Sequence, residues 1–522
     1  MSLFAFTRQA TSSLRYAPRA IGCASLQYAQ RKCMSSAAET VSNTDTDREY
    51  IRNMSMKEWK HRWTDAVQHI DHKLTYTESS DQLRKLIKGG LLRFTDLRDN
   101  PERFFEAHRI LALHAPKLGP GFWIRFTVQY NLFAGTILGL ATDKQRAALD
   151  VMQSEGTLGC FGLTEKLAGV NSGLVINTTA TYDHGTQTFT LNTPGEGSEK
   201  NWISQGYVAD KALIFADLHI DGKSKGGHGF VLDMRTDGKL AEGVEIFDMG
   251  RKTVGNDLDN ASIRLTNVTI PKDTLLSRFG GINSDGVYEP APKGIVPMQM
   301  IGQRLFTGRV AVAQAALSFS RELFRMTKEY SDNKKCWAPE GSPMLTDIPQ
   351  LKALYAEAAE RDTNLTKFVA KCEAELSEAL KKHELPSLKL IESIACAKVL
   401  GVEQSIELTH RLKQEVGSYA LMAETGFEQL DFLQCCKFAE GDSRILMQKM
   451  ARDRMRIFTK KQQQVDNSDP ELKLCGEIAA GMATALKQNG GDKQAAWDDQ
   501  WVNTYDLARA TMKRTMADFM AN

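Results

Sequence analysis

The sequence predicts a multidomain α+β protein with an N-terminal helical domain, a central antiparallel β domain, a C-terminal four-helix bundle and an extra helical C-terminal tail. Three observations support this fold class. Apolar residues recur at helical spacing from Met56 to about Leu140, short alternating segments follow from Cys160 to Ile270, and long helical patterns return near Pro297. Strands and helices do not alternate one by one, which disfavours a Rossmann fold or a TIM barrel.

Length and charge exclude several classes of protein. The 522 residues leave room for about three or four domains of ~100–200 residues each. Lys and Arg number 66 against 64 Asp and Glu, so the chain lacks the basic excess of a nucleic-acid-binding protein. The most apolar stretch, Phe122–Ala141, is interrupted by Arg125, Gln129 and Asn131. We therefore expect no membrane span.

The N-terminal segment has a biased composition. Residues 1–38 are rich in Ser, Ala and Gln and contain no acidic residue, and their basic residues are Arg8, Arg15, Arg19, Arg31 and Lys32. This composition predicts a mitochondrial transit peptide and a location in the mitochondrial matrix, the alternative being a plain disordered tail. The polar residues 39–56 are expected to form a linker.

The cysteines favour a reducing compartment. Nine are present, and Cys23 and Cys33 fall in the presumed transit peptide. The other seven are scattered, odd in number and without a Cys-x-x-Cys pair, which argues against a disulfide framework and against a zinc site. No metal is expected.

The N-terminal helical domain is predicted over residues 57–158. Asn100-Pro101 is a helix start signal for the segment that follows it. The last helix of the domain, Ala141–Met152, should be capped by Thr142 or Asp143.

The β domain is predicted over residues 159–275. Thr178–Tyr182 and Thr186–Asn192 should pair as a hairpin in which Gly185 takes a positive φ. The segment Gly226–Gly229 should be a loop before a strand. Further strands are expected at Ala212–Ile220, Gly229–Met234, Val244–Met249, Ala261–Leu265 and Val268–Ile270.

The bundle is predicted over residues 296–465 and the helical tail over 466–522. Four long helical patterns with short connections are typical of a bundle. These patterns cover Gln303–Tyr330, Ile348–His383, Ser387–Ser418 and Ile445–Gln464.

Generic dinucleotide, P-loop and serine-hydrolase motifs are absent from the sequence. What remains is an ordered set of segments across the domains: Cys160–Gly169, Lys200–Gly206, Met249–Asn256 and Phe438–Asp442. This order resembles the FAD-dependent acyl-CoA dehydrogenase and acyl-CoA oxidase superfamily over residues ~90 to ~460, with local sequence nearer to the oxidase branch. The resemblance implies that the β domain closes into a β-barrel and that FAD binds between the barrel and the bundle.

The resemblance also implies site residues. Thr164 would contact the flavin pyrimidine ring, the indole of Trp202 would cover the isoalloxazine, and Ser204 would sit near N5. Without the family, each of these three is better explained as an ordinary strand, core or turn residue. The remaining assignments are Lys334, Gln414 and Gly417 to FAD, the last two from a neighbouring subunit, and Arg304 to the substrate.

Glu440 is the candidate base. The resemblance implies that this carboxylate removes the α-proton of an acyl-CoA while hydride leaves Cβ for flavin N5, and a desolvated carboxylate has the raised pKa that such a base needs. The alternative is that Glu440–Ser443 is only a turn and helix cap. Glu424 and Glu428 are the nearest other carboxylates upstream.

Two functions follow. The first is a flavoenzyme that oxidises acyl-CoA to trans-2-enoyl-CoA and passes electrons to electron-transfer flavoprotein or to oxygen. The alternative is a non-catalytic, dehydrogenase-like subunit of a large mitochondrial assembly, favoured by a degenerate glycine-rich loop at Gln414–Ala420. A homodimer or homotetramer is expected because one bundle helix is apolar around most of its girth. Its apolar residues include Val310, Val312, Ala315, Ala316 and Phe319.

Overall fold

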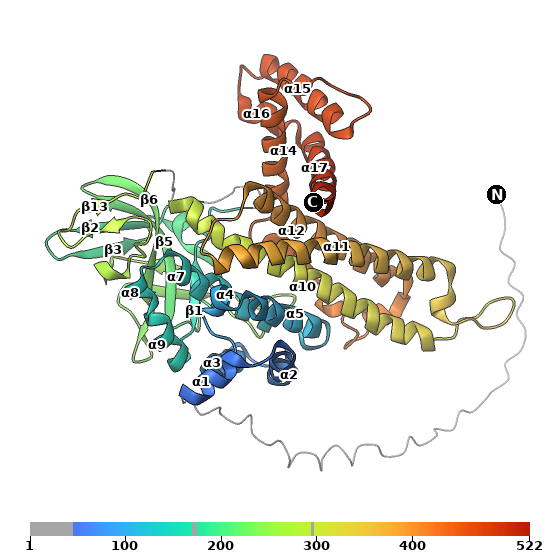
Figure 1. The fold of residues 1–522 in the computed structure, drawn as a ribbon, viewed down its shortest axis with the longest axis horizontal. Coiled ribbons are helices and arrows are strands. Elements are labelled where there is room, and N and C mark those ends of the chain that lie inside the picture. Colours follow the sequence, from blue (N-terminus) through green and yellow to red (C-terminus); the bar gives the residue numbers. More distant parts are fainter. Residues whose placement is uncertain (1–44, 170–174, 294–296, 522) are drawn as a thin grey trace, which may run out of the picture. The chain divides into compact units, whose positions relative to one another are not determined.

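The computed structural model describes residues 45–169, 175–293 and 297–521 (Figure 1). The predicted transit peptide, residues 1–38, lies outside the described residues. Part of the predicted linker is helical, because α1 spans Asp45–Asn53.

The N-terminal helical domain is built as its sequence pattern predicts. Thr75 starts α3 with a capping box, in which its hydroxyl accepts from the Glu78 amide and the Glu78 carboxylate accepts from the Thr75 amide. Thr142 caps α8 in the same way with Gln145, so the predicted cap is confirmed, although the predicted helix divides in two. The helices are α2 (Met56–Val67), α3 (Tyr76–Gly89), α4 (Asp96–Asp99), α5 (Pro101–Leu118), α6 (Gly121–Thr127), the π-helix η2 (Val128–Ala134), α7 (Gly135–Leu140), α8 (Asp143–Arg146) and α9 (Ala148–Glu155).

The described part of the β domain contains a six-stranded sheet, a three-stranded sheet and two pairs of short strands, β7 with β8 and β12 with β13. The large sheet runs β6–β5–(β1, β2)–β3–β11, since the long β5 pairs with β6 on one side and with both β1 and β2 on the other; β4, β10 and β9 form a second sheet of three strands. The strands are β1 (Gly159–Gly162), β2 (Thr179–Asp183), β3 (Thr188–Asn192), β4 (Lys200–Ser204), β5 (Lys211–Ile220), β6 (Lys223–Asp233), β7 (Arg235–Thr236), β8 (Lys239–Leu240), β9 (Val244–Asp248), β10 (Asn260–Leu265), β11 (Val268–Pro271), β12 (Gly281–Ile282) and β13 (Tyr288–Glu289).

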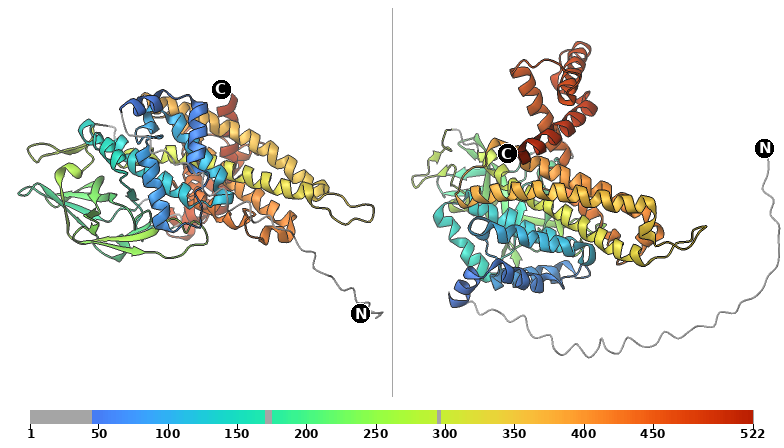
Figure 2. Two further views of the ribbon diagram at one scale, coloured as in Figure 1. Left: turned by 90° about the horizontal axis from the view of Figure 1, so that it is seen from below. Right: turned by 45° about the vertical axis from the view of Figure 1, so that its right-hand side comes forward.

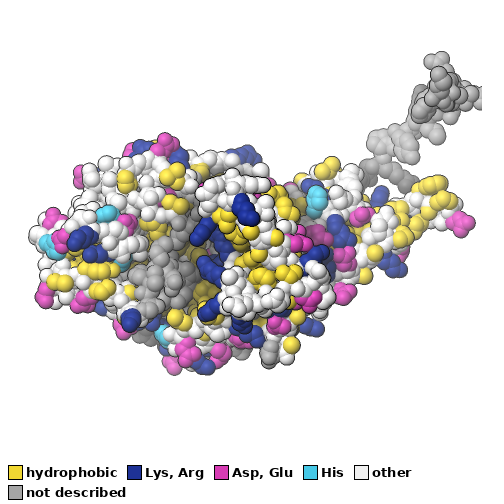
Figure 3. Space-filling model, turned by 90° about the horizontal axis from the view of Figure 1, so that it is seen from above, with side chains coloured by type: hydrophobic (Ala, Val, Ile, Leu, Met, Phe, Trp, Pro, Cys, Tyr) yellow, Lys and Arg dark blue, Asp and Glu magenta, His cyan; other side chains and the backbone are white. Residues whose placement is uncertain are grey.

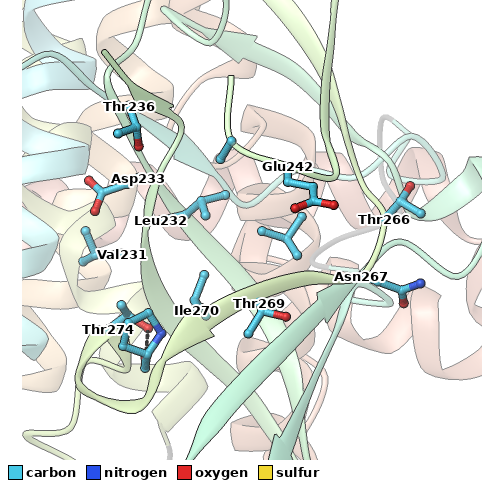
Figure 4. Close-up of a pocket in the computed structure, with 13 residues that line it drawn as sticks. Val231, Leu232, Asp233, Thr236, Glu242, Thr266, Asn267, Thr269, Ile270 and Thr274 are labelled. Carbon is cyan, nitrogen blue, oxygen red and sulfur yellow. Dashed lines mark hydrogen bonds between the residues drawn. The ribbon is translucent and has the colours of Figure 1, made fainter. Parts of the chain in front are cut away.

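The predicted closed β-barrel is wrong, because the large sheet curls only into a half-barrel. An isolated bridge joins Phe230 of the edge strand β6 to Leu275, which follows the other edge strand, β11, by four residues. Beside this bridge the edges stay apart and leave a hollow of about 450 Å³, lined by Val231–Asp233 of β6 and Val268–Pro271 of β11 (Figure 4). None of the predicted site residues lines this hollow.

Three smaller predictions for the β domain also fail. The sheet is not wholly antiparallel, since β5 pairs in parallel with β1 and with β2. The hairpin of β2 and β3 forms as predicted, with Thr179 opposite Asn192, but the positive φ in its turn belongs to Gln187 and not to Gly185. Residues Gly226–Gly229 lie inside β6, because the strand continues past its bulge toward Lys223.

The bundle confirms the four long helical patterns. Its helices are α10 (Pro297–Asn333), α11 (Pro349–Lys381), α12 (Leu388–Glu415) and α14 (Ser443–Lys460), with the short α13 (Asp431–Phe438) before α14. Helix α10 packs against α5, α11 and α12. The apolar residues of α10, which were expected to be covered either by their own bundle or by a partner subunit, are covered within one chain, at 1% exposure or less: Val310, Val312, Ala315, Ala316 and Phe319.

The predicted tail is helical and packs on the bundle. It comprises α15 (Pro470–Gln488), α16 (Lys493–Asp498) and α17 (Trp501–Ala521), and α17 packs against α12 and α14 (Figure 2). The Phe519 ring is buried against Phe368, and Lys371 donates to the Phe519 carbonyl oxygen at 2.8 Å. The short 3-10 helices are η3 (Glu196–Ser198), η4 (Lys272–Thr274), η5 (Leu345–Asp347), η6 (Gly417–Leu421) and η7 (Phe427–Gln429).

The surface carries charges of both signs. Acidic and basic side chains both occur across the face shown in Figure 3, in keeping with the small net charge of +2. Among the described helices, none is long and apolar enough to cross a membrane.

Candidate functional site

Glu440 occupies a strained turn between two helices. It lies in the loop of residues 439–442, which we call the Glu440 loop and which joins α13 to α14. Glu440 has a φ of 57° and Gly441 a φ of 94°. A positive φ is uncommon for a residue with a side chain and persists only where surrounding contacts hold it.

The Glu440 carboxylate is buried with one oxygen bonded and one free of partners. The residue is 9% exposed, and Asn131 Nδ2 donates to its Oε1 at 3.1 Å. Its Oε2 has no hydrogen-bond partner among the described residues. A buried polar atom without a partner is costly unless something else binds there, so this oxygen is the one available to a ligand.

Burial raises the pKa of Glu440 to about 7, although Arg309, Asn131 and Lys398 each favour the charged form. The desolvation effect wins because Asn131 supplies only one hydrogen bond to the carboxylate. Arg309 does not bond the carboxylate; its Nε donates to the Glu440 main-chain oxygen at 3.0 Å. A carboxyl group with this pKa can both take and release a proton near neutral pH.

A glycine makes room for this side chain. Gly308 lies in α10 directly opposite the carboxylate, and a Cβ at position 308 would stand 2.2 Å from Glu440 Cδ. Only a residue without a side chain fits at that position while the carboxylate keeps its place.

The contact from Asn131 comes from a π-helix. The π-helix η2 interrupts the α6–α7 helix with a wider turn, a form found frequently at functional sites. Thr307 Oγ1 donates to Asn131 Oδ1 at 2.6 Å, which fixes the amide so that its Nδ2 points to Glu440. Asn131 is therefore held from one side and donates on the other.

The same π-helix reaches the β domain through Gln129. Its Oε1 accepts from the Gly159 amide at 2.8 Å and from Gln205 Nε2 at 2.9 Å. Gly159 begins β1 and Gln205 follows β4. The helix that contacts Glu440 thus also contacts β1, which Thr164 follows, and the end of β4, which carries Trp202 and Ser204.

Thr164 is exposed and lies two residues beyond the end of β1. Its carbonyl oxygen accepts from the Asn201 amide at 2.9 Å, which joins the end of β1 to β4. The next residue, Glu165, is fully buried; it accepts from Lys200 Nζ at 2.9 Å and from the Thr178 amide at 2.9 Å. Glu165 therefore anchors the strand end while the Thr164 hydroxyl stays on the surface.

Trp202 sits on a β-bulge that turns its indole outward. The register between β10 and β4 shifts at this point, and Trp202 has a φ of 59°. A bulge inserts an extra residue and redirects side chains, and the indole is 56% exposed. Ser204, two residues on, is partly buried and accepts from Asn260 Nδ2 at 3.0 Å.

The remaining predicted cofactor residues form a second group elsewhere in the chain. Lys334 follows the last residue of α10, and the helix from Arg309 to Asn333 is about 36 Å long at 1.5 Å per residue. Gln414 and Gly417 lie at the C-terminal end of α12 and are exposed. The ring of Tyr330 in α10 stacks on that of Tyr419, with centroids 3.7 Å apart. The C-terminal end of α10 therefore lies next to the segment that follows α12.

Gly417 also has a local explanation. Its φ of 61° places it in the left-handed position that ends many helices, directly after the C-cap Val416. The glycine is thus required by the helix end whatever binds there. Arg304 is in α10, but its side chain lies outside the described residues.

Sequence reasoning missed several residues of this site, namely Asn131, Thr307, Gly308, Arg309 and Lys398. One signal was available for the first of them. Asn131 and Gln129 interrupt an otherwise apolar stretch, and both are fully buried and hydrogen-bonded. A polar residue in such a stretch needs a partner, and here one partner is the candidate base.

Known proteins with a similar sequence are acyl-CoA oxidases. The peroxisomal acyl-coenzyme A oxidase 2 of Arabidopsis thaliana is 29% identical over 411 residues, which cover 73% of this chain and 57% of the relative. Acyl-coenzyme A oxidase 1 of Yarrowia lipolytica is 28% identical, covering 63% of this chain and 51% of the relative.

Solved structures agree in fold. Acyl-CoA oxidase-2 of Caenorhabditis elegans, solved with FAD, ascaroside-CoA and ATP, superposes with a TM-score of 0.73 at 19% identity, covering 91% of this chain and 78% of that one. Butyryl-CoA dehydrogenase of Megasphaera elsdenii gives a TM-score of 0.56 at 21% identity, covering 77% of this chain and 96% of that one. The chain is therefore similar in sequence to acyl-CoA oxidases and in fold to both acyl-CoA oxidases and acyl-CoA dehydrogenases, the superfamily that its motifs resemble.

The sequence relatives are named acyl-CoA oxidases, which supports the resemblance to the oxidase branch that the local motifs predict. No family model matches the chain. The chain spans about half the length of the curated oxidases that it matches, from 57% down to 44% for the first three.

The comparison corrects the predicted location. Two of the matched oxidases of the superfamily are named peroxisomal, which contradicts the mitochondrial matrix. The prediction failed because it rested mainly on the composition of residues 1–38, and an Arg- and Ser-rich, acid-free segment is also what a plain basic tail has. No finding supports the alternative of a non-catalytic subunit of a mitochondrial assembly.

Proposed function

We propose that the chain is an FAD-dependent acyl-CoA oxidase of the peroxisome that forms a trans-2-enoyl-CoA, with Glu440 as the base. The observation that carries this proposal is the Glu440 carboxylate. It is buried, its pKa is raised to about 7, and its Oε2 has no partner among the described residues. A helix cap or an ordinary turn would require none of these features.

The chain supplies the proton chemistry. An acyl group bound beside Glu440 would bring its α-carbon to Oε2, the oxygen that no other described group occupies. Asn131 holds the other oxygen, so the carboxylate keeps one orientation throughout the transfer. A base with a pKa near the working pH is ionised often enough to act and strong enough to take the proton.

The residues near β1 and β4 fit a flavin. Trp202 presents an exposed indole from a strained bulge, and Thr164 presents an exposed hydroxyl from a strand end that a buried ion pair fixes. An aromatic face suits a flat ring system and a hydroxyl suits its carbonyl and nitrogen atoms. FAD, when bound, would supply the acceptor for the two electrons that leave the substrate.

The second residue group supports a shared cofactor site. Lys334, Gln414 and Gly417 lie about 36 Å along α10 from Glu440, too far to belong to the same end of one chain's site. We infer that they meet the cofactor of a second copy, in a homodimer or homotetramer. The substrate contact of Arg304 remains a proposal of the same kind.

The purified full chain should be yellow and should bleach when an acyl-CoA is added without oxygen. Admission of oxygen should restore the colour and form hydrogen peroxide, whereas a dehydrogenase would stay bleached until electron-transfer flavoprotein is added. The measurement is a visible spectrum with a panel of acyl-CoAs of different chain length. A colourless protein that neither binds FAD nor oxidises any of them would contradict the proposal.

Replacing Asn131 should move the pH dependence of the reaction. In Asn131→Leu the carboxylate loses a hydrogen bond that favours its charged form, so the Glu440 pKa rises and more alkaline solution is needed to ionise it. We expect the acidic limb of log(kcat/KM), with its midpoint near pH 7 in the native chain, to move up by about one pH unit. Thr307→Val removes the hydrogen bond that fixes the Asn131 amide, and it should move the limb less in the same direction. An unmoved limb in both variants would show that Asn131 does not set the pKa of the base.

A further inference from the structure

One buried lysine has no part in the function proposed so far. Lys398 lies in the middle of α12, is fully buried, and directs its ammonium group at the loop that carries Glu440. Burial lowers its pKa to about 7, as expected for a cation removed from water. A buried lysine is rare unless its donors are all used.

In its ammonium form Lys398 uses all three of its donors, and the three acceptors lie in the Glu440 loop or next to it. Nζ donates to the Lys437 carbonyl oxygen at 2.6 Å, to the Gly441 carbonyl oxygen at 3.0 Å and to Ser443 Oγ at 3.0 Å. Lys437 belongs to the last turn of α13, Gly441 to the loop and Ser443 to the first turn of α14. One ammonium group therefore ties the end of one helix to the start of the next.

We propose that Lys398 is a positioning residue for Glu440, because its three hydrogen bonds close the Glu440 loop and hold the base in its left-handed conformation. The inference rests on the proposed role of Glu440. Lys398 does not touch the carboxylate or any reacting atom, so it acts through the main chain of the loop.

The backbone of the loop explains why it needs these three hydrogen bonds, which we call the Lys398 clamp. Two successive residues, Glu440 and Gly441, have a positive φ, which is strained for the first of them. Arg309 bonds the carbonyl oxygen of Glu440, and Lys398 bonds that of Gly441. The carbonyl groups of both positive-φ residues are thus bonded by basic side chains, Arg309 from α10 and Lys398 from α12.

The position of Lys398 and one further contact fit the same role. A cation at the C-terminal end of a helix satisfies free carbonyl groups and opposes the helix dipole, which is the position Lys398 takes at α13. Glu403, also on α12, pairs with the Lys437 side chain at 2.8 Å. Helix α12 therefore contacts α13 next to the loop twice, through Lys398 at the Lys437 carbonyl oxygen and through Glu403 at the Lys437 side chain.

The first test measures the loop itself by hydrogen exchange in the purified full chain. The reporter amides are those of Ala439, which donates to the Cys435 carbonyl oxygen, and Arg444, which donates to Asp442 Oδ1. Lys398→Met should speed their exchange by about tenfold or more, because the hydrogen bonds from Nζ to both ends of the loop are lost. Lys389→Met, an exposed lysine of the same helix, should leave them unchanged.

The second test measures turnover with a saturating acyl-CoA. Lys398→Met should lower kcat by about tenfold or more while KM changes little, since the misplaced group acts on the chemical step. Lys398→Arg, which keeps a cation with several donors, should recover part of both the kcat and the slow exchange. A cation that merely fills space would show no such recovery.

Ser443→Ala keeps the inference testable if Lys398→Met does not fold. It removes one of the three acceptors and should speed exchange of the reporter amides by a smaller factor of about threefold. Native-like exchange in Lys398→Met, or in Ser443→Ala when the former does not fold, would overturn the clamp, as would an unchanged kcat in Lys398→Met. Failure of the native chain to oxidise any acyl-CoA would instead reject the proposed function, while the exchange measurement still decides whether the clamp exists.

Discussion

Glu440→Gln should bind FAD and acyl-CoA yet lose flavin reduction by at least ~10²-fold, the usual scale for removal of a general base. Glutamine keeps the size of the side chain and can still accept from Asn131 Nδ2, so the site should keep its shape. It cannot take the α-proton. The measurement is anaerobic stopped-flow reduction at a saturating acyl-CoA, with binding of a non-reacting thioester analogue measured separately.

Two matched variants test whether the loss is specific. Glu424→Gln and Glu428→Gln remove the nearest upstream carboxylates, and both should reduce flavin at a near-native rate because Glu424 is exposed and Glu428 bonds only its own turn. Near-native reduction in Glu440→Gln, together with loss in either of the other two, would move the base to that position.

The same substitution should stabilise the protein above pH 7. The folded-state pKa of Glu440 is raised from 4.5 to about 7, so the folded chain favours the neutral carboxyl and the unfolding free energy falls as pH rises through this window. Glutamine is never charged and avoids that loss. We expect Glu440→Gln to raise the unfolding free energy by about 1–3 kcal/mol at pH 8 and by little at pH 4.

Arg125→Met should destabilise the chain by about 3–5 kcal/mol, since it leaves a buried carboxylate without its partner. Arg125 is fully buried, and its guanidinium bonds Asp259 Oδ1 at 3.1 Å and Gln205 Oε1 at 3.2 Å in the β domain. It also donates to the Tyr76 carbonyl oxygen at 3.1 Å in α3. One side chain thus joins the N-terminal helices to the sheet that carries Trp202.

Denaturant unfolding of the full chain measures this effect. Arg325→Met is the matched control, because that arginine pairs only with Glu322 and Glu329 at the surface and should cost less than about 1 kcal/mol. Equal costs for the two variants would show that Arg125 does not join the two parts.

The helices could be predicted from sequence because their signals are local. Thr142 with Gln145 forms a capping box within four residues, and Pro349 starts α11 at its first position. The curl of the sheet could not be predicted in this way. It depends on whether Phe230 meets Leu275, which are 45 residues apart, and on how many bridges follow.

The site was predictable only in part for a similar reason. Glu440 was found through a resemblance, since a Glu-Gly pair before a helix is common to many turns. Its pKa depends on burial by groups from η2, α10 and α12, and residues such as Asn131 lie 309 positions away in sequence. Only the unexpected polarity of Asn131 in an apolar stretch hinted that it had a partner.

Gly308 lowers the stability of α10 at a position where the site needs space. In a helix interior, glycine is less stable than alanine by roughly 0.5–1 kcal/mol, and α10 carries Ala311, Ala313, Ala315 and Ala316 soon after this glycine. Gly308→Ala is the usual kind of substitution for stabilising a helix. Here its methyl group would stand 2.2 Å from Glu440 Cδ, so the carboxylate would have to move. A substitution chosen to stabilise α10 at position 308 would therefore displace the proposed base, although it changes no residue that takes part in the reaction.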